Sequence, residues 1–137
     1  RMNIMFEGYS KAIAIEGQSA LSLARTMILP AAQKTQRDVA ESVAAAKALG
    51  LVVERQSERL RELSTRIESL VGAIDELARV FEHAESHEGT AQAHAQLYRD
   101  QVVPAMRRLR EHADVLETLV DDAYWPLPKY REVLFLQ

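Results

Sequence analysis

Residues 60–81 read LRELSTRIESLVGAIDELARVF, and this stretch decides the fold. Its apolar residues recur in alternating steps of three and four, at Leu60, Leu63, Ile67, Leu70, Ile74, Leu77 and Phe81. Such spacing keeps apolar side chains on one face of an α-helix, as in a heptad seam. On the other face, Glu62 and Arg66 are four residues apart, as are Asp75 and Arg79, so each pair can meet on the solvent side. The stretch predicts a long amphipathic helix that needs partners of comparable length.

Three breaks divide the rest of the chain. Gly50, Gly89 and the segment Trp125-Pro126-Leu127-Pro128 are the strongest helix breakers, and they predict helices over about residues 2–48, 52–86 and 88–122. The connections at 49–51 and 87–90 are short, and short connections make successive helices antiparallel neighbours. The sequence therefore predicts an all-α fold. We expect a single domain over 1–137, an up-down-up bundle of three long helices with an extended Trp-Pro-x-Pro tail.

The outer two helices supply faces that match the seam. The third helix contributes Ala91, Ala95, Tyr98, Val102, Met106, Leu109, Ala113, Leu116 and Val120. The second half of the first helix contributes Ile28, Ala32, Thr35, Val39, Val43 and Ala46. These faces predict one core along the bundle, with Leu70 deeply buried in it.

Pro30 and Pro104 lie inside the first and third predicted helices, in the similar contexts Leu-Pro-Ala and Val-Pro-Ala. Proline removes a helical hydrogen bond and kinks a helix, so both helices are expected to be kinked. Each proline lies about 17 or 18 residues before its predicted helix end, which would place both kinks near one level and bend the bundle as a unit. Two independent kinks are the alternative.

Composition excludes several classes of protein. The 137 residues include no cysteine, which excludes disulfide scaffolds and cysteine-ligated zinc. The net charge of −3 argues against a generic nucleic-acid partner, and no apolar run approaches the ~20 residues that span a bilayer. The chain begins at Arg1, so an earlier natural start stays open.

Three polar clusters are candidate sites, and each also has a simpler interpretation. His83, His87 and His94 could ligate zinc, but they lie at a helix–turn junction among Glu82, Glu85 and Glu88, where a solvated turn is the preferred interpretation. Asp121 and Asp122 could do acid–base work if burial separated their pKa values, but a role in fixing the turn at Trp125 is preferred.

The third cluster consists of Arg107, Arg108 and Arg110, which could grip a phosphate. Glu111 and Asp114 lie within one helical turn, so a charge network within the helix is preferred. No glycine-rich phosphate loop or nucleophile elbow occurs in the sequence. We therefore predict no catalytic, cofactor-binding or metal-binding residue in this chain.

Both ends of the chain carry apolar residues that another surface is expected to bury. Met2, Ile4, Met5, Phe6, Tyr9, Ile13 and Ile15 surround much of the first helix turns, which predicts contact with another domain or subunit. In the tail, Pro126 and Pro128 extend the backbone, and we expect Trp125, Leu127 and Tyr130 to dock on the bundle. Val133, Leu134 and Phe135 predict one last turn that also needs a cover.

Two stretches and the tail resemble the carboxy-terminal region of type III glutamine synthetases. The first stretch is Phe6 to Glu16, followed by Ala24 and the run Ile28-Leu29-Pro30-Ala31-Ala32. The second is Val102 to Arg110, followed by Asp114, Leu116-Glu117 and Val120, and the tail runs from Trp125 to Phe135. The resemblance covers about half of the chain, mostly at its ends.

This resemblance implies a large cytoplasmic enzyme that joins ammonia to glutamate with ATP and a divalent metal. It implies that the catalytic region lies upstream, so no ligand of glutamate, ATP or metal can be carried over to a residue here. The expected function is that of a helical structural and assembly domain, in contact with the upstream catalytic domain and with other subunits of a homo-oligomer. The alternative is a stand-alone helical adaptor whose seam binds a partner helix. The number of subunits and any regulatory ligand stay open.

Overall fold

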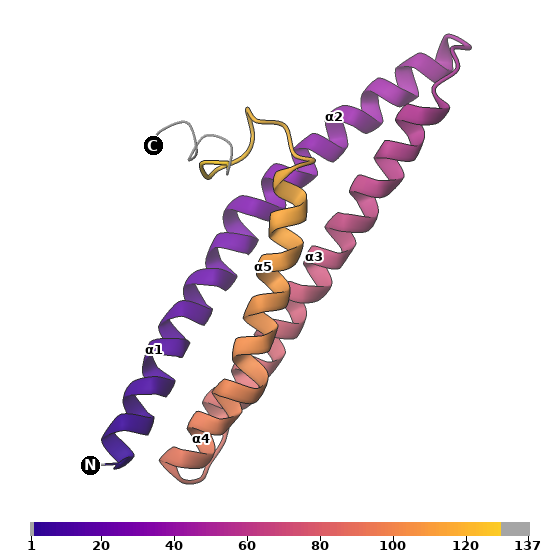
Figure 1. The fold of residues 1–137 in the computed structure, drawn as a ribbon. Helices are drawn as coiled ribbons and strands as arrows, with labels where there is room; N and C mark the ends of the chain where they lie inside the picture. The colour runs from indigo at the N-terminus through magenta and orange to yellow at the C-terminus, as the bar shows by residue number, and fades with distance from the viewer. Residues whose placement is uncertain (1, 130–137) are drawn as a thin grey trace.

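A computed structural model describes residues 2–129, which form three antiparallel rods (Figure 1). The first rod is continuous through α1 (Met2–Leu23), the π-helical turn η1 (Ala24–Ile28) and α2 (Leu29–Ala48). The second is α3 (Glu54–Ser86). The third joins α4 (Ala91–Leu97), the π-helical turn η2 (Tyr98–Val102) and α5 (Val103–Glu117). Residues 2–129 contain no strand, so the predicted all-α, up-down-up bundle is confirmed.

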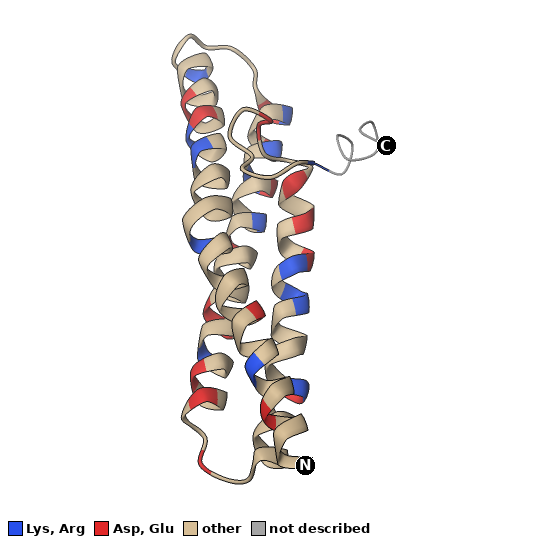
Figure 2. Ribbon diagram, turned by 90° about the vertical axis from the view of Figure 1, so that its left-hand side faces the viewer, with Lys and Arg blue, Asp and Glu red and all other residues tan. Residues whose placement is uncertain are grey.

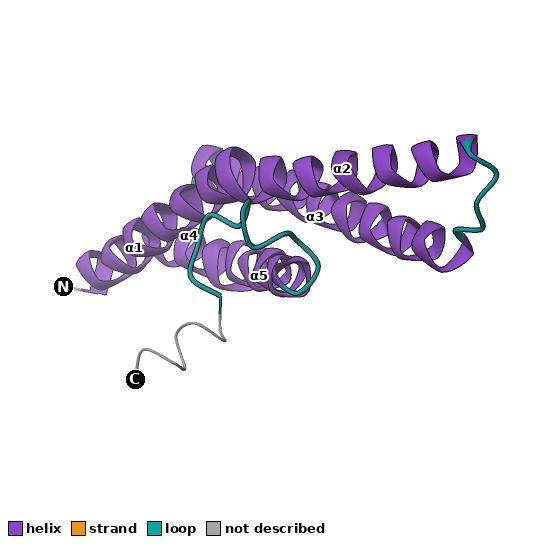
Figure 3. Cartoon of the chain, turned by 90° about the horizontal axis from the view of Figure 1, so that it is seen from above, coloured by secondary structure: helices purple, strands orange, loops and turns teal. Residues whose placement is uncertain are grey.

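The third rod, Ala91–Glu117, is the shortest of the three, and the sequence did not predict the two-helix arm that results. Figure 1 shows that α2 and α3 continue past the carboxyl end of α5 as a two-helix arm, and the view from above in Figure 3 shows the same arm. The arm ends in a tight turn at Gly50, whose φ of 76° is the left-handed conformation that closes a helix. There the N–H of Leu51 donates to Ala46 and the N–H of Gly50 donates to Lys47.

The predicted seam of α3 is the centre of the core. Leu63, Ile67, Ile74 and Phe81 are buried, Leu70 and Leu77 are 0% exposed, and Leu60 is half-buried at the arm end. The third rod buries Tyr98, Val102, Leu109 and Leu116 against the same cluster, and the first rod buries Leu21, Ala24, Ile28 and Ala32. The matching faces predicted for the outer helices are thus confirmed.

The third helix is shorter than predicted at both ends. It begins at Ala91, where the Thr90 side chain accepts a hydrogen bond from the N–H of Ala93 at 3.1 Å. It ends at Glu117 rather than near residue 122, because the next residues form tighter turn bonds, such as that from the N–H of Leu119 to Leu116 at 2.9 Å.

A π-helical turn precedes each internal proline. The N–H of Leu29 donates to Ala24, and the N–H of Val103 donates to Tyr98, five residues back in both cases. The wider turn accommodates the proline ring and its missing N–H without ending the helix. A shared bend stays a prediction. The prediction that both prolines lie at one level along the bundle is wrong. Gly17 lies beside Met106 and Thr35 lies beside Asp121, so Pro104 and Pro30 are at different heights along the bundle axis.

The ion pairs predicted on α3 are also wrong. Within residues 2–129, neither Glu62 with Arg66 nor Asp75 with Arg79 is an ion pair. The ion pair that does form within α3 joins Arg61 to Glu58 at 2.7 Å. Exposed pairs gain little free energy in water, so spacing alone does not determine which of them form.

Leu70→Ala is expected to lower the free energy of unfolding by about 2–5 kcal/mol, because it opens a cavity where the side chain is fully enclosed. Chemical denaturation followed by circular dichroism measures the change. Leu51→Ala, at an exposed position in the connecting turn, is the matched control, with an expected effect below ~0.5 kcal/mol. Equal effects of the two substitutions would contradict the heptad assignment.

Candidate functional site

The tail is attached to α2 where α5 ends. The hydroxyl of Thr35 accepts a hydrogen bond from the N–H of Asp121 at 3.1 Å and donates one to the carbonyl of Ala31 at 3.2 Å. Thr35 is buried, so this pairing satisfies polar atoms that water cannot easily reach. The sequence placed Thr35 among core-facing residues but gave no signal of its bond to the tail.

Asp121 organises the turn that follows. Its carbonyl accepts hydrogen bonds from the N–H groups of Tyr124 at 3.0 Å and Trp125 at 3.1 Å, and its carboxylate accepts one from the N–H of Ala123 at 2.9 Å. The preferred interpretation, that the acidic pair fixes the Trp125 turn, is confirmed for Asp121. Trp125 packs half-buried against the core as predicted, whereas Leu127 is exposed. The predicted docking of Tyr130 and the predicted last turn at Val133, Leu134 and Phe135 lie outside the described residues.

Tyr124 adds a second link between the tail and α2. Its hydroxyl donates to the carboxylate of Asp38 at 2.5 Å, and the Lys34 ammonium lies 6.0 Å from its ring centroid. The hydrogen bond to Asp38 raises the pKa of the Tyr124 hydroxyl, because losing the proton would break the bond and place two negative charges together.

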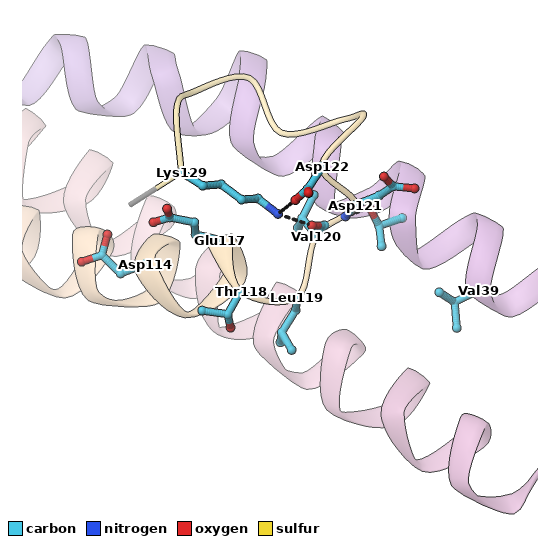
Figure 4. Close-up of a pocket in the computed structure, with 10 residues that line it drawn as sticks. Val39, Asp114, Glu117, Thr118, Leu119, Val120, Asp121, Asp122 and Lys129 are labelled. Atoms are coloured by element: carbon cyan, nitrogen blue, oxygen red, sulfur yellow. Dashed lines mark hydrogen bonds and ion pairs between the residues drawn. The ribbon is translucent and has the colours of Figure 1, made fainter. Parts of the chain in front are cut away.

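Lys129 returns the tail to α5 (Figure 4). Its ammonium donates to the carbonyl of Val120 at 2.7 Å and pairs with Asp122, and its side chain is only 13% exposed. These residues line a hollow of about 910 Å³ together with Asp114, Glu117, Thr118, Leu119, Asp121, Thr35 and Val39. The bonds of Thr35, Asp121 and Lys129 together hold the tail against α2 and α5, and we call these three residues the clip.

The histidines lie apart from one another at the far end of the bundle. The rings of His83 and His87 are 6.2 Å apart between centroids, and a His94 ring nitrogen lies 2.5 Å from the carbonyl of Ala84. Across residues 2–129, no group of three or more histidines and carboxylates is arranged to hold a metal ion. His94 is half-buried rather than solvated, and the solvated-turn interpretation of His83 and His87 stays a prediction.

The sequence placed Tyr98, beside these histidines, among the core-facing residues but gave no signal of its bond to Glu85. The Tyr98 hydroxyl donates to the carboxylate of Glu85, and its ring lies edge-on to both Phe81 and His94. Burial raises the pKa of Tyr98, and the bond to Glu85 raises it further. Tyr98 therefore remains a neutral donor that joins α3 to the third rod.

The arginine cluster divides between two surfaces. Arg108 pairs with Glu76 of α3, so the predicted network within the helix is wrong for this residue, whose side chain crosses to the neighbouring rod. Arg107 and Arg110 line a groove between α1 and α5 instead. In the view of Figure 2, positive and negative residues are interspersed along the bundle rather than gathered by sign.

The outer face of α1 is apolar. Ile4 is 73% and Met5 70% exposed, and this face is continued by Met2, Gly8, Tyr9, Ala12 and Ile15. Phe6 and Ile13 are half-buried against the bundle, so the uncovered face is narrower than the sequence predicted. No helix within residues 2–129 is long and apolar enough to cross a membrane.

Comparison with known proteins identifies the family. A family model of the glutamine synthetase C-terminal domain matches residues 1–47. Across its whole length, the chain is 32% identical to the type-3 glutamine synthetase of Dictyostelium discoideum, and over 98% of its length it is 32% identical to a glutamine synthetase of Bacteroides fragilis. The chain belongs to the family of glutamine synthetase C-terminal domains.

The chain spans 19% of the length of these two glutamine synthetases, and of a third from Butyrivibrio fibrisolvens that is 28% identical. The residues matched by the family model cover α1, η1 and nearly all of α2. The apolar outer face of α1 and the tail anchor Thr35 thus lie in the part of the chain that the glutamine synthetase C-terminal domain model describes.

Thr35→Val is expected to lower the free energy of unfolding by about 1–3 kcal/mol, because the methyl group leaves the N–H of Asp121 without its acceptor. Thermal or chemical denaturation measures the loss. Thr26→Val is the matched control. The Thr26 hydroxyl also donates to the carbonyl four residues back, at Ser22, but it is exposed and does not bond to the described part of the tail. If the control loses as much stability as Thr35→Val, the tail bond is not the cause.

Proposed function

We propose that this chain serves as a structural and assembly domain of a larger glutamine synthetase. The observation that carries the proposal is the apolar outer face of α1, whose residues are exposed in the isolated chain, Ile4 at 73% and Met5 at 70%. A face of this kind on a helical surface is typical of a contact with another domain or subunit. In the parent enzyme it would pack on the catalytic body or on a neighbouring subunit.

The parent reaction proposed for this chain is the ATP-dependent ligation of ammonia to glutamate, which yields glutamine. The relatives are named glutamine synthetases, and the chain corresponds to about a fifth of their length. In this proposal the groups that bind glutamate, ATP and a divalent metal belong to the remaining part of the polypeptide. The domain would act in the cytoplasm and support catalysis by holding the assembly together.

The charge pattern of α1 supports an interface. Its 22 residues include only Glu7, Lys11 and Glu16 as charged residues, whereas the interior of most stable interfaces is depleted of charge and rich in methionine and aromatic residues. Burial of apolar area is worth roughly 25 cal/mol for each Å² removed from water. Association entropy opposes this gain, so the isolated domain is expected to associate only weakly or moderately.

A second candidate function rests on the arm. At its tip Leu49, Leu51 and Val52 are exposed, Val52 at 85%. A stand-alone adaptor could present such a tip to a partner. The two candidates differ in their gene context: a glutamine synthetase catalytic region encoded directly before Arg1 supports the first, and a complete gene that starts at this chain supports the adaptor.

The isolated chain is expected to form no γ-glutamyl product from glutamate, ammonia, ATP and magnesium. The reason is that the described residues bring together no set of groups for phosphoryl or acyl transfer. A coupled assay for ADP release, run on successive purification fractions, measures it. Turnover that follows the chain through purification would place catalytic groups in the domain itself.

The isolated chain is expected to self-associate through the outer face of α1. The double variant Met5→Glu, Ile15→Glu should convert the associated chain to a monomer, because both substitutions place a charge in the apolar face. Sedimentation velocity at tens of micromolar measures the change. Gln56→Glu with Thr65→Glu adds the same charge at exposed positions of α3 and is the matched control. A monomeric parent chain, or an oligomer that survives both charges in α1, would contradict this interface.

A further inference from the structure

The apolar outer face of α1 has the same spacing in both directions along the helix. Its central residues are Met5, Gly8, Ala12 and Ile15, which follow one another in steps of three, four and three. Such steps keep the four residues on one side of an α-helix, and we call them the α1 stripe. All four are exposed, Met5 at 70% and Ile15 at 59%. The large side chains lie at the two ends of the stripe, and the small residues lie in its middle.

A stripe with this symmetry fits a second copy of itself. A two-fold axis brings the same patch of both copies together, so the patch must be complementary to its own reverse. If two α1 helices run antiparallel and cross at the level of Ser10, positions equally far before and after Ser10 face each other. Met5 then faces the partner's Ile15, and Gly8 faces the partner's Ala12. Each large apolar side chain therefore meets another, and each small residue meets a small one.

Gly8 supports a close approach of two helices. Glycine destabilises the interior of a helix relative to alanine. A Cβ on Gly8 would meet no atom within 4 Å, so packing inside the chain does not require a glycine there. The distance between two packed helices depends on the side chains at their contact, and it is shortest where small residues face each other. A second α1 helix beside Gly8 gives this glycine a structural role.

The charges of α1 favour the antiparallel direction. Glu7 and Lys11 are the charged residues between Met2 and Ile15, and both are exposed on the same flank of the stripe. At ~1.5 Å per residue, crossing at Ser10 places Lys11 about 3 Å along the axis from the partner's Glu7. The two glutamates and two lysines then form a neutral group. Parallel helices would instead place each charge level with the same charge of the partner, and like charges repel.

We propose that two copies of this domain pair through antiparallel α1 helices, with Gly8 of each copy against the partner's Ala12. The inference rests on the proposed assembly role, and it names a second copy of the same helix as the occupant of the α1 face. Pairing buries the stripes of both copies at once. Because the helices are antiparallel, the arms of the two domains point in opposite directions.

Cysteine cross-linking tests the direction of pairing, because the chain has no native cysteine to interfere. Met5→Cys and Ile15→Cys are made in separate chains, which are mildly oxidised alone and as an equal mixture. A disulfide needs Cα atoms within ~7 Å of each other. Antiparallel pairing brings position 5 of one chain to position 15 of the other, whereas two copies of either position lie about 15 Å apart along the axis. The mixed disulfide should therefore form at least ~tenfold faster than either symmetrical one, and mass spectrometry distinguishes the products.

A glycine substitution tests the close approach. Gly8→Leu enlarges the middle of the stripe, so it should weaken self-association at least ~tenfold, measured by sedimentation velocity. A face that associates through apolar character alone would bind as tightly or more tightly, because leucine adds apolar area. Gly72→Leu is the matched control: Gly72 is also an exposed helical glycine whose Cβ would meet nothing within 4 Å, but it lies on α3. Circular dichroism checks that both variants keep their helical content.

Each outcome supports or overturns antiparallel pairing. A fast mixed disulfide together with weaker association of the Gly8→Leu chain supports it. Fast symmetrical disulfides, equal rates for all pairs, or a Gly8→Leu chain that associates as tightly as its parent overturn it. If Met5→Glu, Ile15→Glu dissociates the parent chain but the cross-links are symmetrical, the direction is wrong and the assembly role of the face stands. A parent chain that stays monomeric overturns the pairing as well as the predicted self-association.

Discussion

The structure depends on one face of one helix, the α3 seam. Leu70 and Leu77 are completely enclosed because both other rods pack on that face. Two rods can share one seam only if they come close to it, and small residues make this approach possible. Ala24, Ala31 and Ala32 of the first rod and Ala105 of the third are buried at the contacts, and a Cβ on Gly17 would lie 3.1 Å from the Phe81 ring.

The extent of the α3 seam also determines where the three-rod part of the molecule ends and the two-helix arm begins. The main core runs along α3 from Leu63 to Ala84, and Val43 and Val53 are buried outside it, in the arm. Beyond Glu117 each arm helix has a single partner, so it buries less apolar surface per residue than the three-rod part. The clip of Thr35, Asp121 and Lys129 lies at this boundary, where the tail takes over the place of the third rod.

The features that depend on the spacing of apolar residues were predicted correctly from the sequence. The heptad spacing in α3 and the glycines at positions 50 and 89 were sufficient for the class, the topology and most of the core. The sequence did not predict the early end of α5 or the Tyr98 bond to Glu85, because each depends on which residues of distant segments come together. For the same reason spacing gave the wrong partner for Arg108. The proline signals were correctly located, but the response is a π turn, since a wider turn relieves the clash while the rod stays continuous.

The proposed assembly role must account for two apolar surfaces at opposite ends of the molecule. The outer face of α1 lies at the amino-terminal end, whereas Leu49, Leu51 and Val52 lie at the tip of the arm (Figure 1). Because α3 alone is ~50 Å long at ~1.5 Å per residue, one compact contact cannot cover both. A closed two-fold dimer through α1 would leave the tip exposed. If both surfaces are covered in the parent enzyme, the domain needs two different neighbours, one held by α1 and one reached by the arm. A bridging element of this kind needs a rod that stays continuous along its length, and the first rod, unbroken through Pro30, has that property.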